Sequence, residues 1–338
     1  MCRSRSASRR NQNPTINSLQ ERRNKGVKDG IVKMLVGVCA VMSLSAEQTG
    51  PQRRVLCADD SKKILALVDA QGSVKWQHPV GPIHGAQILA NGNVLFQVNW
   101  TRVVEVTMDE KKQVVWEYDA KKHAPGGKSV EIHAFQRLEN GDTMIAESGT
   151  CRILEVSTKG EIRKQFPMKV NHPSTHSDTR QVVKLPNGHY LAAHERDGMV
   201  REYDINGAVV WDYEVPLFDQ KPLPGHGVEA YGNALFGIQR LENGNTLIGC
   251  GNGHRVLEVT PKKEIVWKLE ASDLPGIELA WICGVKRLPN GNTRFVNCHA
   301  GPKNPQMVEV DSRKNIIWTM RDFVHFGNSM PVGMVVEE

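Results

Sequence analysis

The sequence has no apolar run long enough to cross a membrane as a helix. Its most apolar stretch, residues 34–44, has about 11 residues, whereas a spanning helix needs roughly 20. The 338 residues are 40% hydrophobic and 24% charged, which supplies enough apolar side chains for a sizeable core. These features exclude a bundle of membrane helices and a wholly disordered chain.

Most of the chain also lacks an excess of positive charge. The net charge is +6, but residues 1–46 hold nine of the 43 Lys and Arg residues and two of the 37 acidic residues. Residues 47–338 therefore carry a net charge of −1. Because nucleic-acid binding depends on clustered positive charge, we expect no nucleic-acid partner.

Residues 1–46 show the order of features of an export signal. A basic lead precedes the apolar residues 34–44, and the small residues Ser45 and Ala46 follow them. We therefore expect residues 1–46 to be a targeting segment, with an over-extended start, and the protein to be periplasmic or secreted. A basic tail followed by a short buried segment is the alternative.

Cysteine is scarce after residue 46 and forms no ligand motif. The five cysteines are Cys57, Cys151, Cys250, Cys283 and Cys298. An odd number cannot all pair, and their spacing fits neither a zinc site nor a CxxC motif, so we expect buried free thiols with at most one or two disulfides. The sequence also lacks a Gly-rich phosphate loop, a GxSxG elbow and an HExxH motif, so no local catalytic motif identifies a reaction.

What the sequence does contain is a repeat. Five segments share the pattern Leu-x-Asn-Gly followed by apolar residues, and they occupy residues 88–96, 137–145, 184–192, 240–248 and 287–295. Asn-Gly between apolar runs is typical of a tight two-residue β-hairpin turn, in which both turn residues take positive φ. The repeat therefore predicts five β-hairpins spaced 47 to 56 residues apart.

Each hairpin is followed by a second one that ends in an aromatic residue. These second hairpins occupy residues 103–118, 153–166, 200–213, 256–269 and 307–320, and a sixth copy occupies residues 64–78. Their final strands carry Trp76, Trp116, Phe166, Trp211, Trp267 and Trp318. An aromatic residue at a fixed place in each unit is expected to pack one sheet onto the next, as core rather than as ligand contacts.

Four antiparallel strands per repeat at this period predict a β-propeller. The first copy lacks an inner strand, and the C-terminal segment 331–338 is a lone strand that can supply it. Joining the two gives a sixth blade and closes the ring, which removes exposed sheet edges. We therefore expect an all-β fold with one six-bladed propeller over residues 47–338.

The histidines are predicted to gather on one face of the ring. In such blades the loops between strands B and C and the connections between blades share a face, and 11 of the 12 histidines fall in or beside them. His84, His133 and Arg180 hold the same position in three successive repeats, beside the axis. The predicted ligand-binding residues are His84, His133, His176, Asp178, Arg180, His194, His226, His254 and His299.

Imidazole and guanidinium donors around an axial funnel suit a small anionic or sugar-like ligand. No metal ligands are assigned and no cofactor is expected. A divalent metal remains an open alternative, because ligands from different blades would leave no local spacing.

The repeat, with Val-x-Glu-Val and Val-x-Trp after each Asn-Gly, resembles the PQQ-like (quinoprotein-like) propellers and most closely their arylsulfotransferase branch. The resemblance covers residues 53–338 and lies in scaffold positions. Six blades match the arylsulfotransferases and argue against PQQ, since the quinone-dependent dehydrogenases have eight. Arylsulfotransferases form a sulfohistidine near the axis, so the resemblance makes His84, His133, Arg180 and His226 the candidate catalytic residues, with no motif that fixes the nucleophile.

Three functions remain open at this point. The first is an exported propeller that binds a small anionic ligand on its His- and Arg-rich axial face. The second is an arylsulfotransferase-like or lyase-type enzyme that uses an axial His as nucleophile or base, with Arg180 stabilising negative charge. The third is a scaffold for a protein partner, because fold alone does not decide function.

Overall fold

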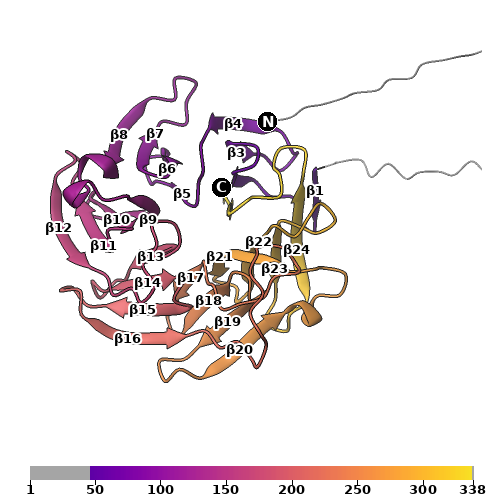
Figure 1. The fold of residues 1–338 in the computed structure, drawn as a ribbon. Coiled ribbons are helices and arrows are strands. Elements are labelled where there is room, and N and C mark those ends of the chain that lie inside the picture. Colours follow the sequence, from indigo (N-terminus) through magenta and orange to yellow (C-terminus); the bar gives the residue numbers. More distant parts are fainter. Residues whose placement is uncertain (1–45, 337–338) are drawn as a thin grey trace, which may run out of the picture. The chain divides into compact units, whose positions relative to one another are not determined.

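The computed structural model describes residues 46–336, and the predicted targeting segment lies outside them apart from Ala46. The described residues form six antiparallel sheets that follow one another around a ring in chain order (Figure 1). The predicted six-bladed β-propeller is therefore confirmed. No helix among residues 46–336 is long and apolar enough to cross a membrane.

In each blade, strand A is innermost and strand D is outermost. Blade 1 is formed by β25 (Val332–Val335), β2 (Val55–Asp59), β3 (Ile64–Val68) and β4 (Val74–Pro79). Blade 2 is formed by β5 (Ala86–Ile88), β6 (Val94–Asn99), β7 (Arg102–Val106) and β8 (Val114–Asp119). Blade 3 is formed by β9 (Glu131–Arg137), β10 (Thr143–Ser148), β11 (Arg152–Val156) and β12 (Ile162–Pro167).

The second half of the ring repeats the same order. Blade 4 is formed by β13 (Gln181–Lys184), β14 (Tyr190–His194), β15 (Met199–Tyr203) and β16 (Val209–Glu214). Blade 5 is formed by β17 (Ile238–Arg240), β18 (Thr246–Cys250), β19 (Arg255–Val259) and β20 (Ile265–Glu270). Blade 6 is formed by β21 (Trp281–Arg287), β22 (Thr293–Cys298), β23 (Met307–Val310) and β24 (Ile316–Asp322).

Strand pairing shows how the two ends of the chain are held in the ring. The C-terminal strand β25 pairs antiparallel with β2, so the predicted closure of blade 1 by the last strand is confirmed. Blade 6 has a fifth strand that the repeat did not predict, β1 (Ala46–Thr49), which pairs with the outer edge of β24. The short 3-10 helices η1 (Ala120–Lys122), η2 (Pro125–Gly127) and η3 (Ala271–Asp273) lie in connections between blades.

The Leu-x-Asn-Gly repeat forms its hairpins in a different way from the one expected. In the first copy the Gly92 N–H donates to the Leu89 carbonyl at 2.9 Å, and the Asn91 side chain accepts the Asn93 N–H at 3.0 Å. Only the glycine has positive φ, at 80°. The turn is therefore a type I turn closed by a left-handed glycine, not a two-residue turn with both residues at positive φ. Asn stabilises it through its side chain, which explains why both residues recur.

The hydrophobic core lies between adjacent blades rather than in one central mass. Six clusters of buried apolar residues occur among the described residues, and each combines side chains mainly from two neighbouring blades. Trp76, Trp116 and Trp318 are buried, as predicted, whereas Trp211 and Trp267 are only partly buried. The pairing of Glu155 with Lys164 shows that Lys164, not Phe166, holds the Trp position in blade 3. Phe166 lies two residues further along the strand and is buried on the same side.

An ion pair links five of the six blade-to-blade interfaces at the same repeat position. The glutamate of Val-x-Glu-Val contacts a basic residue of the next blade, in the pairs Glu105–Arg137, Glu155–Lys184, Glu202–Arg240, Glu258–Arg287 and Glu309–Arg53. The interface between blades 1 and 2 has the apolar residues Leu67 and Ile88 at these positions. The repeated glutamate is therefore a residue that joins blades, which accounts for its recurrence.

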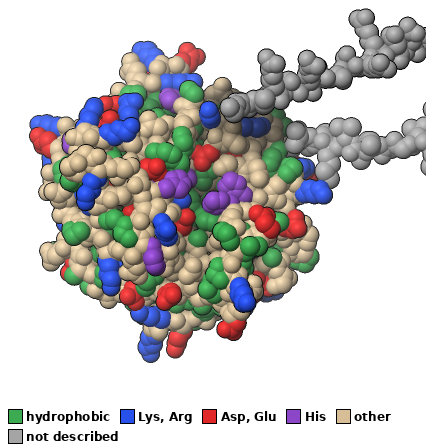
Figure 2. Space-filling model, in the orientation of Figure 1, with side chains coloured by type: hydrophobic (Ala, Val, Ile, Leu, Met, Phe, Trp, Pro, Cys, Tyr) green, Lys and Arg blue, Asp and Glu red, His purple; other side chains and the backbone are tan. Residues whose placement is uncertain are grey.

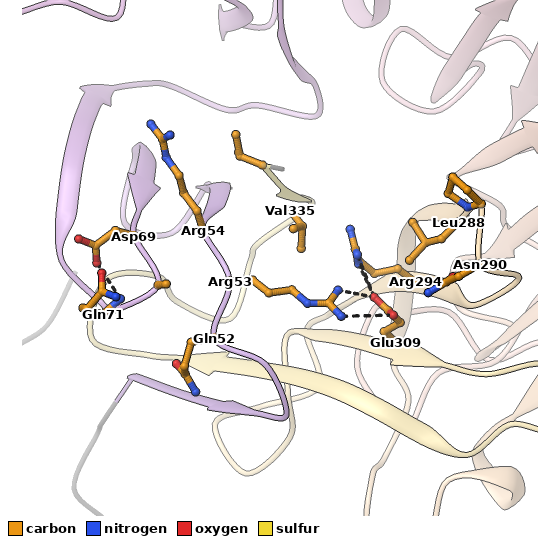
Figure 3. A pocket seen from close by; sticks show the side chains of 13 residues that line it. Gln52, Arg53, Arg54, Asp69, Gln71, Leu288, Asn290, Arg294, Glu309 and Val335 are labelled. Carbon is orange, nitrogen blue, oxygen red and sulfur yellow. Dashed lines mark hydrogen bonds and ion pairs between the residues drawn. The ribbon is translucent and has the colours of Figure 1, made fainter. Parts of the chain in front are cut away.

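The ring closes through Glu309, whose carboxylate meets two guanidinium groups (Figure 3). Arg53 donates to its Oε2 atom at 2.6 Å and Arg294 donates to the same oxygen at 2.8 Å. The Glu309 side chain is 1% exposed, and its hydrogen bonds with Arg53 and Asn292 outweigh the effect of burial and lower the pKa of the carboxyl. The first and last blades are thus held together by charge as well as by the pairing of β25 with β2.

Glu309→Gln is expected to lower the free energy of unfolding by about 2 kcal/mol, because the buried guanidinium groups lose their counter-charge while one amide oxygen remains to accept. Urea denaturation at pH 7 measures this change. The matched control is Glu117→Gln, since the Arg102–Glu117 pair has side chains 39% and 41% exposed and is expected to contribute less than about 1 kcal/mol. Equal losses in both variants would contradict a closing role for Glu309.

Candidate functional site

One repeat position supplies a ring of six residues at the start of the inner strands. The residues five positions before the hairpin leucines are His84, His133, Arg180, Phe236 and Cys283. In blade 1, the pairing of β25 with β2 places Pro331 at the equivalent position. This ring separates two cavities. A cavity of about 360 Å³ runs along the inner strands, and one of about 190 Å³ lies on the side of the inter-blade connections. His84, Arg180, Phe236 and Pro331 line both.

The smaller space, here called the axial cavity, is built by connections and B–C loops from around the ring. Its lining residues are Asp60, His84, Trp100, His176, Arg180, His226, Phe236, Trp281, Cys283, Cys298, His299, Ser329 and Pro331. Histidine side chains gather beside the centre of the face shown in Figure 2. Residues from distant parts of the chain therefore meet at one small, mostly aromatic and basic hollow.

Arg180 and two imidazoles form the centre of this site. The Nδ1 atoms of His84 and His133 are 2.9 Å apart, and Arg180 Nη1 lies 3.0 Å from His84 Nδ1 and 3.3 Å from His133 Nδ1. Arg180 also donates from Nε to the Glu195 carboxylate, and both of these side chains are largely buried. The guanidinium is thus held between a carboxylate and the Nδ1 atoms of two imidazoles.

Burial and charge keep the two central imidazoles neutral. Burial lowers the pKa of His84 well below its ordinary value, and the Arg180 charge lowers it further. Burial likewise lowers the pKa of His133 to about 3, although its hydrogen bond with Glu131 acts in the opposite direction. A neutral imidazole has one N–H donor and one acceptor, so both rings offer mixed hydrogen-bonding capacity at pH 7.

His176 is linked to His133 through Glu131, whose carboxylate contacts both imidazoles. The Glu131 Oε2 atom lies 3.0 Å from His133 Nε2 and 2.8 Å from His176 Nδ1. Trp100 packs against this group, with its ring centroid 5.0 Å from those of both His133 and His176. Burial would raise the pKa of Glu131, but the two histidines lower it to about 2.

The opposite wall of the axial cavity is formed around Trp281. Its ring centroid lies 4.4 Å from that of His226, and His226 lies 5.3 Å from His299. Burial lowers the pKa of His226, whereas for His299 the hydrogen bond with Cys298 and the charges of Asp60 and Asp59 outweigh burial and raise the pKa. This wall therefore combines one neutral imidazole with one that gains a proton more readily.

The structure brings His84, His133, His176, Arg180, His226 and His299 together at the ring and the axial cavity. Three other residues predicted for the site do not line the cavity. His194 is enclosed in blade 4, where Nδ1 lies 3.0 Å from the Asp178 carbonyl and Nε2 lies 2.8 Å from the Tyr203 hydroxyl. The Asp178 carboxylate accepts the Gly149 N–H at 2.9 Å, and His254 lies in the B–C loop of blade 5 with Nε2 buried.

Sequence reasoning missed several residues of this region, among them Glu131, Trp281, Trp100 and Asp60. Glu131 lies two residues before His133 on β9, so strand alternation places both on one face, and that spacing could have identified it. Trp281 likewise lies two residues before Cys283 on β21, so both side chains leave the strand on one face. Trp100 and Asp60 each come from a short B–C loop and leave no comparable signal. All five cysteines after residue 46 are free thiols, of which Cys283 and Cys298 line the axial cavity.

Comparison with solved structures gives proteins of similar fold. A protein of unknown function from Bacteroides caccae is 22% identical with a TM-score of 0.69, over 85% of this chain and 100% of that chain. A virginiamycin B lyase from Staphylococcus aureus, catalytically inactive and bound to quinupristin, is 12% identical with a TM-score of 0.55, over 87% of this chain and 99% of that chain. A streptogramin B lyase is 14% identical with a TM-score of 0.54, over 81% of this chain and 86% of that chain.

No protein-family model and no curated protein matches the chain. Identities of 12% to 22% show a shared fold and nothing finer. The chain is therefore a six-bladed β-propeller of the general kind that includes these proteins, and its chemistry has to be inferred from its own residues.

Proposed function

We propose that the protein is an exported propeller that binds a small organic anion in the axial cavity. The observation that carries this proposal is the meeting of four imidazoles and one guanidinium in a space of about 190 Å³. Side chains of this kind are the usual partners of carboxylate, sulfate and phosphate groups. Export rests on the order of features in residues 1–46.

The charges around the cavity favour an anion at mildly acidic pH. Asp60 is the one carboxylate among the lining residues of the described chain, and burial raises its pKa to about 6 against the opposing hydrogen bond from the Ile83 N–H. As the pH falls from 7.5 to 5.5, Asp60 loses charge and His299 gains it. Anion affinity is therefore expected to rise over this range.

The walls also limit the size and shape of the ligand. Trp100, Trp281 and Phe236 place three aromatic rings around the space. A flat or ring-shaped ligand body would pack on these faces while its anionic group meets the histidines and Arg180. A volume of about 190 Å³ is below the usual range for drug-sized ligands, so the ligand is of monosaccharide size or smaller. Sugar acids and small aromatic acids meet both conditions.

A thermal-shift screen of sulfate, phosphate, small carboxylic acids and sugar acids tests the proposal. A ligand present at 100 times its Kd stabilises the folded state by about 2.7 kcal/mol, which corresponds to a rise in Tm of roughly 5 °C for a domain of this size. The rise is expected for wild type, and it is expected to be lost in His226→Ala/His299→Ala. His172→Ala is the matched control, because His172 has a side chain 64% exposed and lies outside the cavity.

Lack of any shift with every anion at pH 5.5 would reject anion binding and favour the scaffold alternative. Equal shifts in all three proteins would place the ligand elsewhere. The group-transfer alternative needs an imidazole with a free lone pair as nucleophile. In His84 the Nδ1 atom faces Arg180, which leaves Nε2 as a donor. In His133 both ring nitrogens face other polar groups, so this role would fall to His226. Sulfuryl transfer between phenols that is lost in His226→Ala would establish that alternative instead.

A further inference from the structure

We propose that Glu131, His133 and His176 form a binding site for a divalent transition-metal ion of the zinc class beside the axial cavity. This proposal goes beyond anion binding and does not depend on it. One carboxylate oxygen and two imidazole nitrogens, one from each residue, all lie within 4.8 Å of one another. Two imidazoles and one carboxylate are a common set of protein ligands for catalytic zinc, which keeps an open coordination position.

The fold explains how three residues from two segments converge. Glu131 and His133 are two residues apart on β9, so their side chains leave the strand on the same face. His176 comes from the connection between blades 3 and 4 and meets Glu131 at 2.8 Å. Nitrogen donors distinguish this set from magnesium and calcium sites, which use oxygen ligands almost exclusively.

The contacts of the other nitrogen of His133 suit a metal on Nε2. Arg180 has only donors, and it lies closer to His84 Nδ1, at 3.0 Å, than to His133 Nδ1, at 3.3 Å. When His133 binds a metal through Nε2, its proton lies on Nδ1, 2.9 Å from His84 Nδ1, and its lone pair lies on Nε2, beside Glu131 Oε2 at 3.0 Å. Without a metal, Nε2 can instead carry the proton and donate it to Glu131.

A metal ion would take the place of the proton between His133 Nε2 and Glu131 Oε2. The His133 side chain is 0% exposed, so its ring is held in place for such a contact. The contact of His133 Nδ1 with His84 would then be the outer hydrogen bond that metal-bound histidines usually make. Donor atoms around tetrahedral zinc lie about 3.3 Å apart, so the contacts of Glu131 with His133 at 3.0 Å and with His176 at 2.8 Å would lengthen by a few tenths of an ångström around the ion.

The surroundings fit an accessible metal rather than a closed structural one. His133 is buried, Glu131 is partly exposed and His176 has a side chain 52% exposed. His176 also lines the axial cavity. An ion could therefore enter from that side, and its open coordination position would face the space in which we place the ligand.

Isothermal titration calorimetry with zinc chloride tests the site on the full chain after treatment with a chelator, in a buffer without added anionic ligands. One zinc ion per chain is expected for wild type. Cobalt chloride in place of zinc is expected to give the visible absorption of tetrahedral Co²⁺. Affinity should fall at least tenfold in Glu131→Gln and in His176→Ala, whereas His172→Ala, on the same connection, should bind like wild type.

Circular dichroism confirms that each variant is folded, and His176→Ala provides a second test if Glu131→Gln does not fold, because His176 is exposed. Absence of stoichiometric binding, or binding unchanged in both variants, would overturn the metal site. Because no anion is present, either result leaves the anion proposal to its own thermal-shift test.

Discussion

Arg180→Met is expected to lower the free energy of unfolding by about 3 to 5 kcal/mol and to abolish the proposed anion binding. The guanidinium is 4% exposed at its side chain and neutralises Glu195, whose side chain is 11% exposed. Removing it leaves a buried carboxylate without its partner, and the cost of such an unpaired charge is of this size. It also removes the donor that holds the Nδ1 atom of His84.

The structural and ligand-binding effects of this change can be separated with a second substitution. In Arg180→Met/Glu195→Gln no charge remains unpaired, and methionine fills much of the volume of the arginine stem. Most of the lost stability should return, to within about 1 to 2 kcal/mol of wild type. Anion binding should not return, because the permanent positive charge of the cavity is absent.

Urea denaturation and calorimetry with the anion found by the screen measure the two quantities on the same proteins. Glu195→Gln alone is the complementary control, since it leaves Arg180 free to bind an anion and should bind at least as tightly as wild type. Recovery of binding in the double variant would show that Arg180 acts only by stabilising the fold. Undiminished stability of Arg180→Met would show that the pair with Glu195 contributes little.

The fold could be predicted because its causes are local and repeated. Each Leu-x-Asn-Gly segment contains its own turn chemistry, and each Val-x-Glu-Val strand supplies the glutamate that joins the next blade. The missing inner strand of the first copy and the spare strand 331–338 together predicted the closure that β25 and β2 make. The turn type was wrong, because sequence does not distinguish a two-residue turn from a type I turn that ends in a left-handed glycine.

The candidate site was harder to predict because it depends on side-chain direction and on residues outside the repeat. Repeat position placed His84, His133 and Arg180 around the axis, and the structure brings them within 3.3 Å of one another. Repeat position could not distinguish an imidazole that enters the cavity from one that points into a blade. His194 ends β14, and its ring is held between strands by Asp178 and Tyr203. Asp60 and Trp100 come from loops that have no repeat signature.

His194 is expected to make the stability of the protein fall steeply with acid. Its ring is fully buried, Nδ1 donates to the Asp178 carbonyl at 3.0 Å, and Nε2 lies 2.8 Å from the Tyr203 hydroxyl, which also lies 3.1 Å from the Lys169 carbonyl. Burial, together with the Arg201 charge, lowers the pKa of this histidine to about 4. In the unfolded chain its pKa is about 6.5.

Between these two pKa values the unfolded chain binds more protons than the folded one. The free energy of unfolding therefore decreases as the pH falls from about 6.5 to about 4, by up to about 1.4 kcal/mol per unit and by about 3 kcal/mol in all. His194→Asn keeps a donor to the Asp178 carbonyl and lacks the titration. At pH 7 the variant should be about 1 kcal/mol less stable than wild type, through loss of the hydrogen bond to Tyr203.

Because the other titrating groups are the same in both proteins, the difference between their stability curves isolates His194. The two curves should cross between about pH 6 and pH 5, where the free energy of unfolding of wild type has fallen by about 1 kcal/mol. At pH 4 the variant should be about 2 kcal/mol more stable than wild type. Urea denaturation at half-unit intervals of pH measures both curves. The same series on His172→Asn, an exposed histidine, should follow wild type. Parallel curves for wild type and His194→Asn would mean that the buried ring accepts a proton without cost, and the neutral imidazole would then have no part in holding blade 4 together.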